Sequence, residues 1–263
     1  MIDPHFRVEV IAQTPNPQQL TWAAMRQDYS EGFVWDSHAR WADETKAGEL
    51  VVKHLLKGGK GHYGPLEHAQ IAFNAGGFSH STMQQLRTHR VGVSFDVQSF
   101  RYTGQRLMNV ADAILRDPQY EGYTPGICRM SPDVITALEN VIYLRPEGQY
   151  SDRQGKRYNY TWQCRFNDLA LAGHCITHYA RNIESGLSEE HARGLIPFDV
   201  RQNFVMSCNL RSLMHLLDLR AKADAQLEAQ QFCELLMPHF RAWAPAIAEW
   251  YEQTRLGKAR LAP

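Results

Sequence analysis

One short stretch of the chain, residues 84–106, concentrates side chains that bind anions. It carries four arginines and a histidine against a single acid, Asp96. Arginine stays protonated and forms paired hydrogen bonds with phosphate and carboxylate groups, whereas a solvated surface segment usually mixes lysine with glutamate. These residue types favour a site for an anionic, planar ligand, with a structural arginine network as the alternative. The cations are Arg87, His89, Arg90, Arg101 and Arg106, and neutral hydrogen-bonding groups include Gln84, Gln85, Thr88, Gln98, Ser99 and Tyr102.

A second group of charged side chains lies in residues 192–226. In a helix that turns by about 100° per residue, one polar stripe carries Arg211, His215, Asp218 and Lys222. Arg220 falls about 180° away from Arg211 on the same helix. If both arginines bind ligand, the helix is expected to lie between two sites, as at a subunit interface. The alternative is that Arg220 extends from an apolar face into solvent.

Two histidine groups could in principle bind a metal. His174 and His178 have i, i+4 spacing beside Cys175, but HCITH lacks the glutamate of the metalloprotease pattern, so we expect a packed or exposed helix face. The segment HYGPLEH contains His62, Glu67 and His68. A metal site there would need a further ligand that the local sequence does not name. We therefore predict no metal site.

The arginine-rich stretch resembles the signature of the flavin-dependent thymidylate synthases. The segment HRVGVSFDVQSFRY is similar to the family pattern of Arg-His-Arg, seven residues, Ser, and then Arg-Tyr. Thr88 stands where the first arginine is expected, and eight residues separate Arg90 from Ser99. A subset of the family reads Thr-His-Arg with one additional residue here, so the resemblance includes both differences.

The second group resembles the other half of the same signature. It contains Ala-Arg, a Leu/Ile-Pro, then Asn-Leu-Arg-Ser-Leu and a later Leu-Arg. The segment beginning at His62 is similar to a His-x-x-x-x-Glu-His segment that lines the flavin site of the family. His215 stands where the family commonly has asparagine.

The resemblance implies a role for each matching residue. Arg220 would be the catalytic residue, against the uracil ring. The flavin would contact His62, Gly64, Thr88, His89, Arg90, Asn209, Arg211 and His215. The substrate dUMP would contact Gln85, Arg87, Gln98, Ser99, Arg101, Arg193 and Arg220.

The reaction implied by the resemblance is the reductive methylation of dUMP to dTMP. Methylenetetrahydrofolate would supply the carbon, and FAD reduced by NADPH would supply the hydride. The family also implies a homotetramer with shared active sites. No nucleophilic cysteine is then needed, and we expect Cys208 to be a packing residue.

Other functional classes are disfavoured by composition and missing motifs. The 28 basic and 28 acidic residues balance, which argues against a nucleic-acid binder. No G-x-G-x-x-G, P-loop or G-x-S-x-G motif is present. Two alternatives remain: an RNA-binding protein that stacks bases on Tyr158, Tyr160 and Trp162, and a non-catalytic flavin or nucleotide sensor that uses the same basic site.

Cysteine usage and hydropathy indicate the compartment. The five cysteines are odd in number and lack C-x-x-C spacing, which is typical of reduced thiols. No signal peptide and no apolar run of about 18 residues is visible. We expect a cytoplasmic protein with no membrane partner.

The predicted elements position these residues. Strands are expected at 6–11 and 70–75, with helix through most of 19–57, a loop at 58–65 and a Ser81-capped helix over 81–90. Further on we expect a helix after Ser131, a hairpin turning at Gln154-Gly155 and a helix ending at Gly186. Ser188 should begin a short helix, and 207–253 should be helical with breaks at Pro238 and Pro245. The pattern predicts an α+β fold: one domain, residues 1–263, in which a small, mainly antiparallel sheet is packed by helices that include long C-terminal ones. Residues 107–162 are interpreted as a probable insertion.

Overall fold

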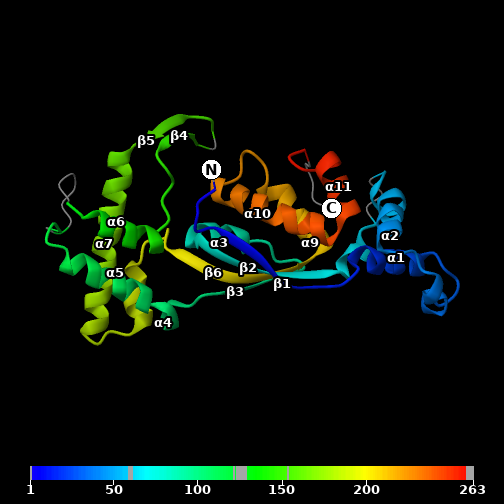
Figure 1. The fold of residues 1–263 in the computed structure, drawn as a ribbon, viewed down its shortest axis with the longest axis horizontal. Helices are drawn as coiled ribbons and strands as arrows, with labels where there is room; N and C mark the ends of the chain where they lie inside the picture. Colours follow the sequence, from blue (N-terminus) through cyan, green and yellow to red (C-terminus); the bar gives the residue numbers. More distant parts are fainter. Residues whose placement is uncertain (1, 59–61, 121, 123–128, 153, 259–263) are drawn as a thin grey trace. The chain divides into compact units, whose positions relative to one another are not determined.

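Alternation of apolar and polar residues produces the strands of a four-stranded sheet (Figure 1), in the order β1-β2-β6-β3. Strand β1 (Arg7–Gln13) pairs antiparallel with β2 (Gln70–Ser79), and an irregularity between Val10 and Ala12 shifts the register. The other two strands are β3 (Val93–Val97) and β6 (Arg201–Asn209). In β2, Ile71, Phe73 and Ala75 are buried while residues between them are more accessible, which fits the alternation.

The computed structural model describes residues 2–58, 62–120, 122, 129–152 and 154–258. The chain forms two compact units. Unit 1 comprises residues 1–76, 84–96 and 204–263, and unit 2 comprises residues 77–83 and 97–203. The boundary at 83/84 falls inside helix α3 (His80–Leu86).

In unit 1, helices from both ends of the sequence pack together. Helix α1 contacts α2, and α11 contacts both α2 and α10. The buried Gln18 holds α1 against α2, because its Nε2 donates to the Glu44 carbonyl at 3.1 Å. It packs so close to Gly48 that a Cβ there would lie 2.7 Å from its amide. The Glu44 carboxylate accepts hydrogen bonds from the backbone N–H groups of Gln18 and Gln19, at 2.9 and 2.8 Å, and so caps α1. The elements are α1 (Pro17–Asp28), η1 (Val34–Arg40), α2 (Glu44–Val51), η2 (Val52–Leu56), η3 (Gly64–Glu67), α9 (Leu210–Arg220), α10 (Leu227–Trp243) and α11 (Pro245–Thr254).

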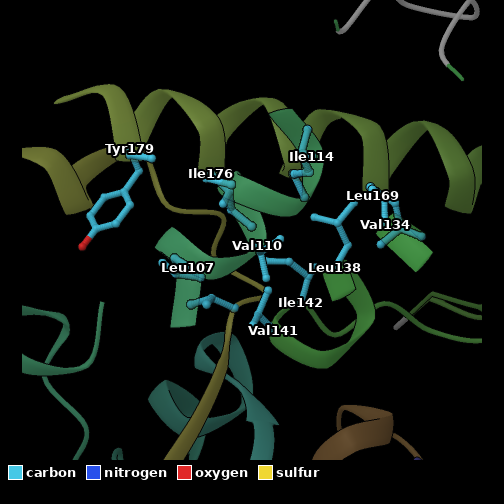
Figure 2. Close-up of a cluster of buried hydrophobic side chains, with 14 of the residues drawn as sticks. Leu107, Val110, Ile114, Val134, Leu138, Val141, Ile142, Leu169, Ile176 and Tyr179 are labelled. Carbon is cyan, nitrogen blue, oxygen red and sulfur yellow. The ribbon is translucent and has the colours of Figure 1, made fainter. Parts of the chain in front are cut away.

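Unit 2 has its own apolar core (Figure 2), built mainly between α5, α6 and α7. Leu107 and Ile114 of α5 are fully buried with Leu138 of α6 and Ile176 of α7. Gly173 lets the helices approach closely, because a Cβ there would lie 3.3 Å from Ile114. The elements are α4 (Phe100–Thr103), α5 (Gln105–Arg116), α6 (Pro132–Val141), β4 (Gly148–Ser151), β5 (Arg157–Tyr160), α7 (Trp162–Glu184), α8 (Glu189–Ala192) and η4 (Arg193–Leu195).

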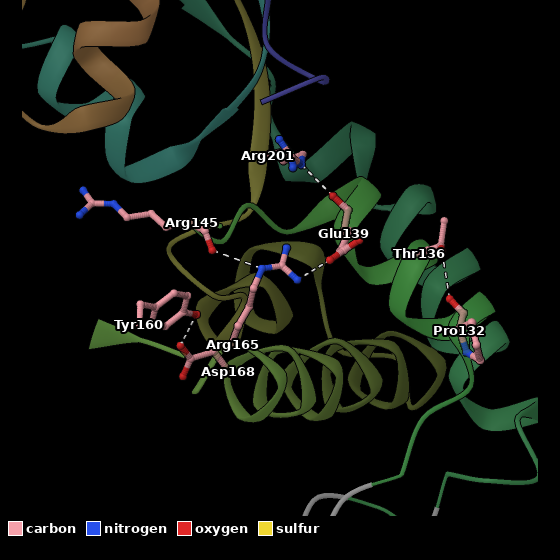
Figure 3. Close-up of polar contacts among 8 residues, drawn as sticks. All are labelled: Pro132, Thr136, Glu139, Arg145, Tyr160, Arg165, Asp168 and Arg201. Atoms are coloured by element: carbon pink, nitrogen blue, oxygen red, sulfur yellow. Dashed lines mark hydrogen bonds and ion pairs between the residues drawn. The ribbon is translucent and has the colours of Figure 1, made fainter. Parts of the chain in front are cut away.

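Polar contacts join the pieces of unit 2 around this core (Figure 3). Arg165 of α7 forms an ion pair with Glu139 of α6 and donates to the carbonyl of Arg145 at 3.2 Å. The Tyr160 hydroxyl, at the end of the hairpin β4–β5, donates to the Asp168 carboxylate at 2.7 Å. Residues 107–162 therefore contribute both core and polar contacts to unit 2; that they are an insertion in a single domain stays a prediction.

Most predicted elements are present. The strand after Phe6, the strand from Gln70, the Ser131-capped helix, the hairpin and the short helix after Ser188 are confirmed. The region 19–57 is mainly helical, but with wider gaps than expected on both sides of η1. Of the loop predicted at 58–65, residues 59–61 lie outside the described part, and residues 64 and 65 belong to η3.

Three predicted boundaries are wrong. Helix α3 ends at Leu86 instead of residue 90, and the backbone N–H of Thr82 is capped by Ser79 at 3.2 Å, not by Ser81. Residues 207–209 are the end of β6, which the sequence analysis missed. Helix α10 continues through Pro238, although α11 does begin at Pro245.

Candidate active site

Helix α9 carries Arg220 as its last residue and directs it onto the end of α3 and the turn that follows it. The Arg220 guanidinium donates four hydrogen bonds within unit 1. Nε donates to His89 Nε2 at 3.0 Å, and Nη1 to Gln85 Oε1 at 3.4 Å. Nη2 donates to the Gln85 carbonyl at 3.1 Å and to Thr88 Oγ1 at 2.9 Å. The sequence predicted all four residues as ligand contacts, and the structure brings them into one cluster, here called the Arg220 cluster.

The acceptors in the Arg220 cluster are all uncharged. An amide, a hydroxyl, a backbone carbonyl and an imidazole surround the guanidinium, and no carboxylate pairs with it among the described residues. Burial lowers the pKa of Arg220 from its usual value near 12.5, but the group remains a cation at neutral pH. A half-buried cation with only neutral partners stabilises an anion that comes close to it.

His89 is held neutral in this cluster. Burial, helped by the charge of Arg220 and the nearby His215, lowers the pKa of His89 to about 4. The His215 ring lies edge-on to the His89 ring, with centroids 5.3 Å apart. Because Nε2 of His89 accepts from Arg220, the proton of the neutral ring must sit on Nδ1.

The beginning of α9 holds the loop that follows the Arg220 cluster. The Asn209 side chain caps the helix by accepting from the backbone N–H of Ser212 at 2.8 Å. The Ser212 hydroxyl donates to the carbonyl of Val91 at 2.8 Å. Gly92 has a φ of 65°, and a side chain there would lie 2.3 Å from Ser212 Oγ and 2.5 Å from Asn209 Nδ2. Only glycine fits this position.

The remaining predicted flavin residues of unit 1 have carboxylate partners or none. Arg211 forms an ion pair with Glu67, the last residue of η3, and His62 Nε2 lies 2.9 Å from Asp28 Oδ2. Gly64 is exposed at the start of η3 with open space around its Cα. Arg90 is exposed, as is Arg87, which was predicted to contact dUMP.

The polar stripe predicted on α9 is wrong at two positions. Asp218 is 2% exposed, and its carboxylate accepts from Tyr251 at 3.0 Å and from Arg255 at 2.7 Å. Lys222 lies beyond the end of the helix at Arg220. Arg220 is half-buried and hydrogen-bonded, so the alternative that it merely extends into solvent is also wrong.

Unit 2 contains the other predicted substrate residues. The Gln98 side chain accepts from the backbone of Asn203 at 3.0 Å, and Ser99 caps α4 through the N–H of Arg101 at 3.4 Å. Arg101 forms an exposed ion pair with Glu190 of α8 at 2.9 Å. Arg193, three residues after Glu190, is exposed at the start of η4. Arg101 and Arg193 are thus both exposed on unit 2, and within the described residues Arg101 is the one held by an acid.

Sequence reasoning missed several residues that support these groups. Gly92 and Ser212 fix the loop, while Glu67, Asp28 and Glu190 are the carboxylates that meet predicted ligand residues. Glu67 lay within a segment already singled out, and Gly92 within the first signature. Ser212 lay within the second signature. Asp28 and Glu190 had no local signal, because their roles depend on contacts across many residues of chain.

The cysteines and histidines of the described part show no metal-binding arrangement. No group of three potential ligands gathers within the described residues. Cys208 is buried, as expected of a packing residue, and burial raises the pKa of its thiol to about 12. Across the described helices, we find none with the length and apolar character needed to cross a membrane.

The α+β architecture places an arginine-centred, carboxylate-free cluster at the C-terminal end of α9, and such a cluster suits an anionic ligand. Residues 9–246 match the family model described as thymidylate synthase complementing protein. Two relatives are named flavin-dependent thymidylate synthase. The one from Haloarcula marismortui is 33% identical, over 97% of this chain and 99% of its own length. The one from Halobacterium salinarum is 30% identical, over 98% of this chain and 100% of its own length. The chain belongs to the family of flavin-dependent thymidylate synthases, which confirms the resemblance in its sequence.

Solved structures share the fold. Thymidylate synthase X from Helicobacter pylori, determined with FAD and dUMP, aligns with a TM-score of 0.66 at 20% identity, over 97% of this chain and all of that one. The UMP/dUMP methylase PolB from Streptomyces cacaoi, bound to 5-Br dUMP, aligns with a TM-score of 0.65 at 19% identity, over 100% and 98%. The α+β prediction is confirmed.

Proposed function

We propose that this chain converts dUMP to dTMP by reductive methylation, and that the Arg220 cluster acts on the pyrimidine. The carbon comes from methylenetetrahydrofolate, and NADPH supplies two electrons as hydride. The uracil C5 proton is lost, and tetrahydrofolate leaves. The observation that carries this assignment is the Arg220 guanidinium, half-buried among neutral acceptors.

Arg220 suits the charge that develops on the ring. When uracil is activated for attack from C5, negative charge spreads over the ring and its carbonyl oxygens. A fixed cation stabilises that charge without having to reorganise. His89, neutral at Nε2, fixes the orientation of the guanidinium through the Nε hydrogen bond, and Thr88 and Gln85 fix its other nitrogen atoms. Their side chains are also placed to exchange these bonds for bonds to a ligand.

Arg101 and Arg193 suit the phosphate of dUMP. Both are exposed on unit 2, and Arg193 has no carboxylate partner among the described residues. Arg101 is paired with Glu190 only in an exposed ion pair, which contributes little and can be exchanged. Gln98 and Ser99 precede Arg101 and complete the substrate group, to which we also assign Arg87.

The residue types around α9 fit FAD. Arg90 offers an exposed guanidinium for a pyrophosphate, and Arg211 offers another that Glu67 now holds. Hydrogen-bonding groups come from Thr88, His89, Asn209 and His215. His62 precedes η3, and Gly64 is its first residue. When bound there, FAD would supply the redox chemistry that links NADPH to the one-carbon unit.

The use of folate and NADPH, the assembly and the location belong to the same proposal. We assign a homotetramer in which copies of the chain share active sites, supported by family membership. The cytoplasmic location is supported by Cys164, Cys175, Cys208 and Cys233, which are all free thiols.

Anaerobic oxidation of NADPH by the FAD-loaded protein tests the function. We expect dUMP to accelerate oxidation and, with methylenetetrahydrofolate present, dTMP to form in step with tetrahydrofolate. UMP should be assayed in parallel, since the fold also occurs in a UMP/dUMP methylase. A protein that binds FAD and dUMP without forming dTMP would be a sensor, and the proposal would be wrong.

Arg193→Ala tests the phosphate assignment. Loss of one charge-assisted contact should weaken dUMP binding by roughly 10- to 100-fold. FAD content should stay unchanged, because Arg193 is not assigned to the flavin. The dissociation constants of both ligands, measured by calorimetry, distinguish the outcomes, and equal losses for dUMP and FAD would contradict the assignment. Arg116→Ala, which removes an exposed arginine on α5, is the matched control in the same unit.

A further inference from the structure

Unit 1 contains a pocket that the assignments above do not use. It lies between α1, η1 and the helical segment formed by α2 and η2, and it has a volume of about 640 Å³. Pockets of this size are typical of small-molecule sites. None of its lining residues belongs to the Arg220 cluster or to the ion pair of Arg211 with Glu67.

The charges around this pocket are positive and uncompensated. Arg26 of α1 and Arg40 of η1 line it together with His54 of η2, and no acid is among the lining residues. Neither arginine forms an ion pair with a carboxylate in the described part of the chain. Arg211 and Arg241 of this unit do pair with acids, Glu67 and Glu252, whereas the two pocket arginines, like Arg220, do not pair with any acid among the described residues. Two arginines left without acids at one cavity are suited to an anion.

Aromatic rings form part of the wall. Trp22 and Tyr29 line the pocket, and the Tyr29 ring is 73% exposed. Trp22 packs edge-on against Trp41 at 6.2 Å, and Trp41 packs edge-on against Trp35 at 5.6 Å. A planar ligand could stack on the exposed ring, so the lining combines ring binding with anion binding.

Hydrogen bonds hold the wall in place. The backbone N–H of Val34 donates to the Gln27 side chain at 3.1 Å, which ties the start of η1 to α1. The Val34 carbonyl accepts from Ser37 Oγ at 2.9 Å and from Trp41 Nε1 at 3.2 Å. Arg40 is therefore presented by a short helix whose start is tied to α1 and whose side chains at Ser37 and at the C-cap Trp41 bond back to Val34.

The pocket adjoins a residue assigned to the flavin. The Tyr29 ring centroid lies 6.3 Å from that of His62, and His62 is hydrogen-bonded to Asp28, the last residue of α1. A ligand that fills the pocket and extends past Tyr29 therefore reaches His62. The position suits a molecule with one reacting end and one anionic end.

We propose that this pocket binds the anionic end of a ring-bearing co-substrate, with Arg26 and Arg40 as its charge contacts. The inference rests on the proposed function, which requires NADPH and a folate. These share the relevant chemistry: an aromatic ring system joined to phosphate groups in one and to glutamate carboxylates in the other. The pocket takes whichever of these anionic ends enters beside Tyr29.

The test is the double variant R26Q/R40Q of the FAD-loaded enzyme. We expect the KM for one co-substrate to rise roughly 10-fold or more, from the loss of charge-assisted contacts. The KM for dUMP, the FAD content and the melting temperature should not change. R7Q, which removes an exposed arginine of β1 in the same unit, is the matched control and should leave every parameter unchanged.

Two arms identify the source of the anion. A loss of the preference for NADPH over NADH would assign the pocket to the 2′-phosphate. A loss of the preference for triglutamyl over monoglutamyl methylenetetrahydrofolate would assign it to the carboxylates. Unchanged KM values for both co-substrates would overturn the proposal. If the double variant fails to fold, R40Q alone removes one exposed charge at the end of η1, and an unchanged KM in both arms would again overturn it.

Binding measurements separate this inference from the function itself. If the wild-type protein forms no dTMP, the proposed function fails, and calorimetry with NADP⁺ and with triglutamyl folate still tests the pocket. Binding by the wild type that R26Q/R40Q lacks would support the pocket. No binding of either probe, or equal binding by the variant, would refute it.

Discussion

The two ends of α9 each carry an arginine, but in opposite electrostatic settings. Arg211, at the N-terminal end, faces the carboxylate of Glu67. Arg220, at the C-terminal end, donates to Gln85, Thr88 and His89, none of which is charged. Both were predicted as ligand residues from similar sequence contexts. Their partners differ because η3 lies at one end and the turn after α3 at the other.

The difference is that the charge of Arg211 is neutralised by an acid, whereas the charge of Arg220 is free to act on a ligand. An exposed ion pair such as that of Arg211 is screened by water and salt and contributes about 0–1 kcal/mol. A half-buried guanidinium with neutral partners keeps its whole charge for a ligand, in surroundings less polar than water. The C-terminal end of α9 is thus prepared for developing negative charge, and Arg211 must exchange a partner before it can bind.

Arg220→Ala should have the largest effect. Removing the only cation of the cluster should lower kcat by about 100- to 1,000-fold, because charge on the pyrimidine would lose its stabilising partner. The fold and the FAD content should be retained, since Arg220 is half-buried and its partners can bind water. Single-turnover kinetics and the flavin spectrum measure the two quantities.

Arg211→Ala is the matched comparison for that variant. It removes an arginine from the other end of the same helix, and its effect should fall mainly on FAD affinity. If Arg220→Ala retained near-normal turnover, or if both variants lost kcat equally, the distinction between the two ends would be contradicted.

Gly92→Ala should have the second largest effect, because Gly92 packs against the N-terminal end of α9. A left-handed φ and a side chain placed 2.3 Å from Ser212 Oγ force the loop away from α9. We expect roughly 2 kcal/mol of lost stability and weaker FAD binding, because the loop follows Thr88, His89 and Arg90. Urea unfolding and flavin titration measure this. Gly32→Ala is a suitable control, since open space surrounds that glycine and it is not assigned to a ligand.

The pH dependence of stability tests the neutral state of His89. Its pKa is about 4 in the folded protein and about 6.5 when unfolded. Since the folded pKa is depressed, the contribution of His89 is fully present above about pH 6.5 and is lost as the pH falls towards 4. The loss should be about 2–3 kcal/mol by pH 4.5.

The measurement is the free energy of unfolding of the flavin-free protein at pH 7.5 and at pH 4.5. His89→Gln, which keeps an acceptor for Arg220 but does not titrate in this range, should show a smaller pH-dependent loss than the wild type. An imidazole that titrates near 6.5 by NMR would mean that burial and the charge of Arg220 do not hold His89 neutral.

The sequence predicted the fold where local signals agreed with burial. The hairpin and the Ser131-capped helix depend on turn and cap residues that act locally. Strand β6 was missed because the polar residues at its start and the helical pattern after it obscured the alternation of Phe204, Met206 and Cys208. Helix α10 continues through Pro238 because Phe232, Leu236 and Phe240 are buried. That burial outweighs a cost of about 3 kcal/mol for the proline.

The site was predictable in its members but not in its pairings. The signature named Arg220, His89, Thr88 and Gln85, while their mutual contacts span more than 130 residues of chain. The polar stripe failed because helical periodicity cannot show which polar side chain is buried. Asp218 lies inside because Tyr251 and Arg255 of the last helical segment satisfy its carboxylate.

Glu67→Gln should have the smallest effect and sharpens the comparison most. It removes the carboxylate partner of Arg211 and makes the N-terminal end of α9 resemble the C-terminal end. Stability should change by less than about 1 kcal/mol, because both side chains are nearly half exposed, at 40% and 45%. FAD affinity should rise a few-fold if Arg211 contacts the flavin, since the arginine no longer has to leave an acid. Flavin titration at low and high salt measures the FAD affinity and its salt dependence. The gain in affinity over wild type should shrink at high salt, because salt screens the ion pair that the wild type retains. Weaker FAD binding in Glu67→Gln would show instead that Glu67 positions Arg211 for the flavin, and that the ion pair is part of the site.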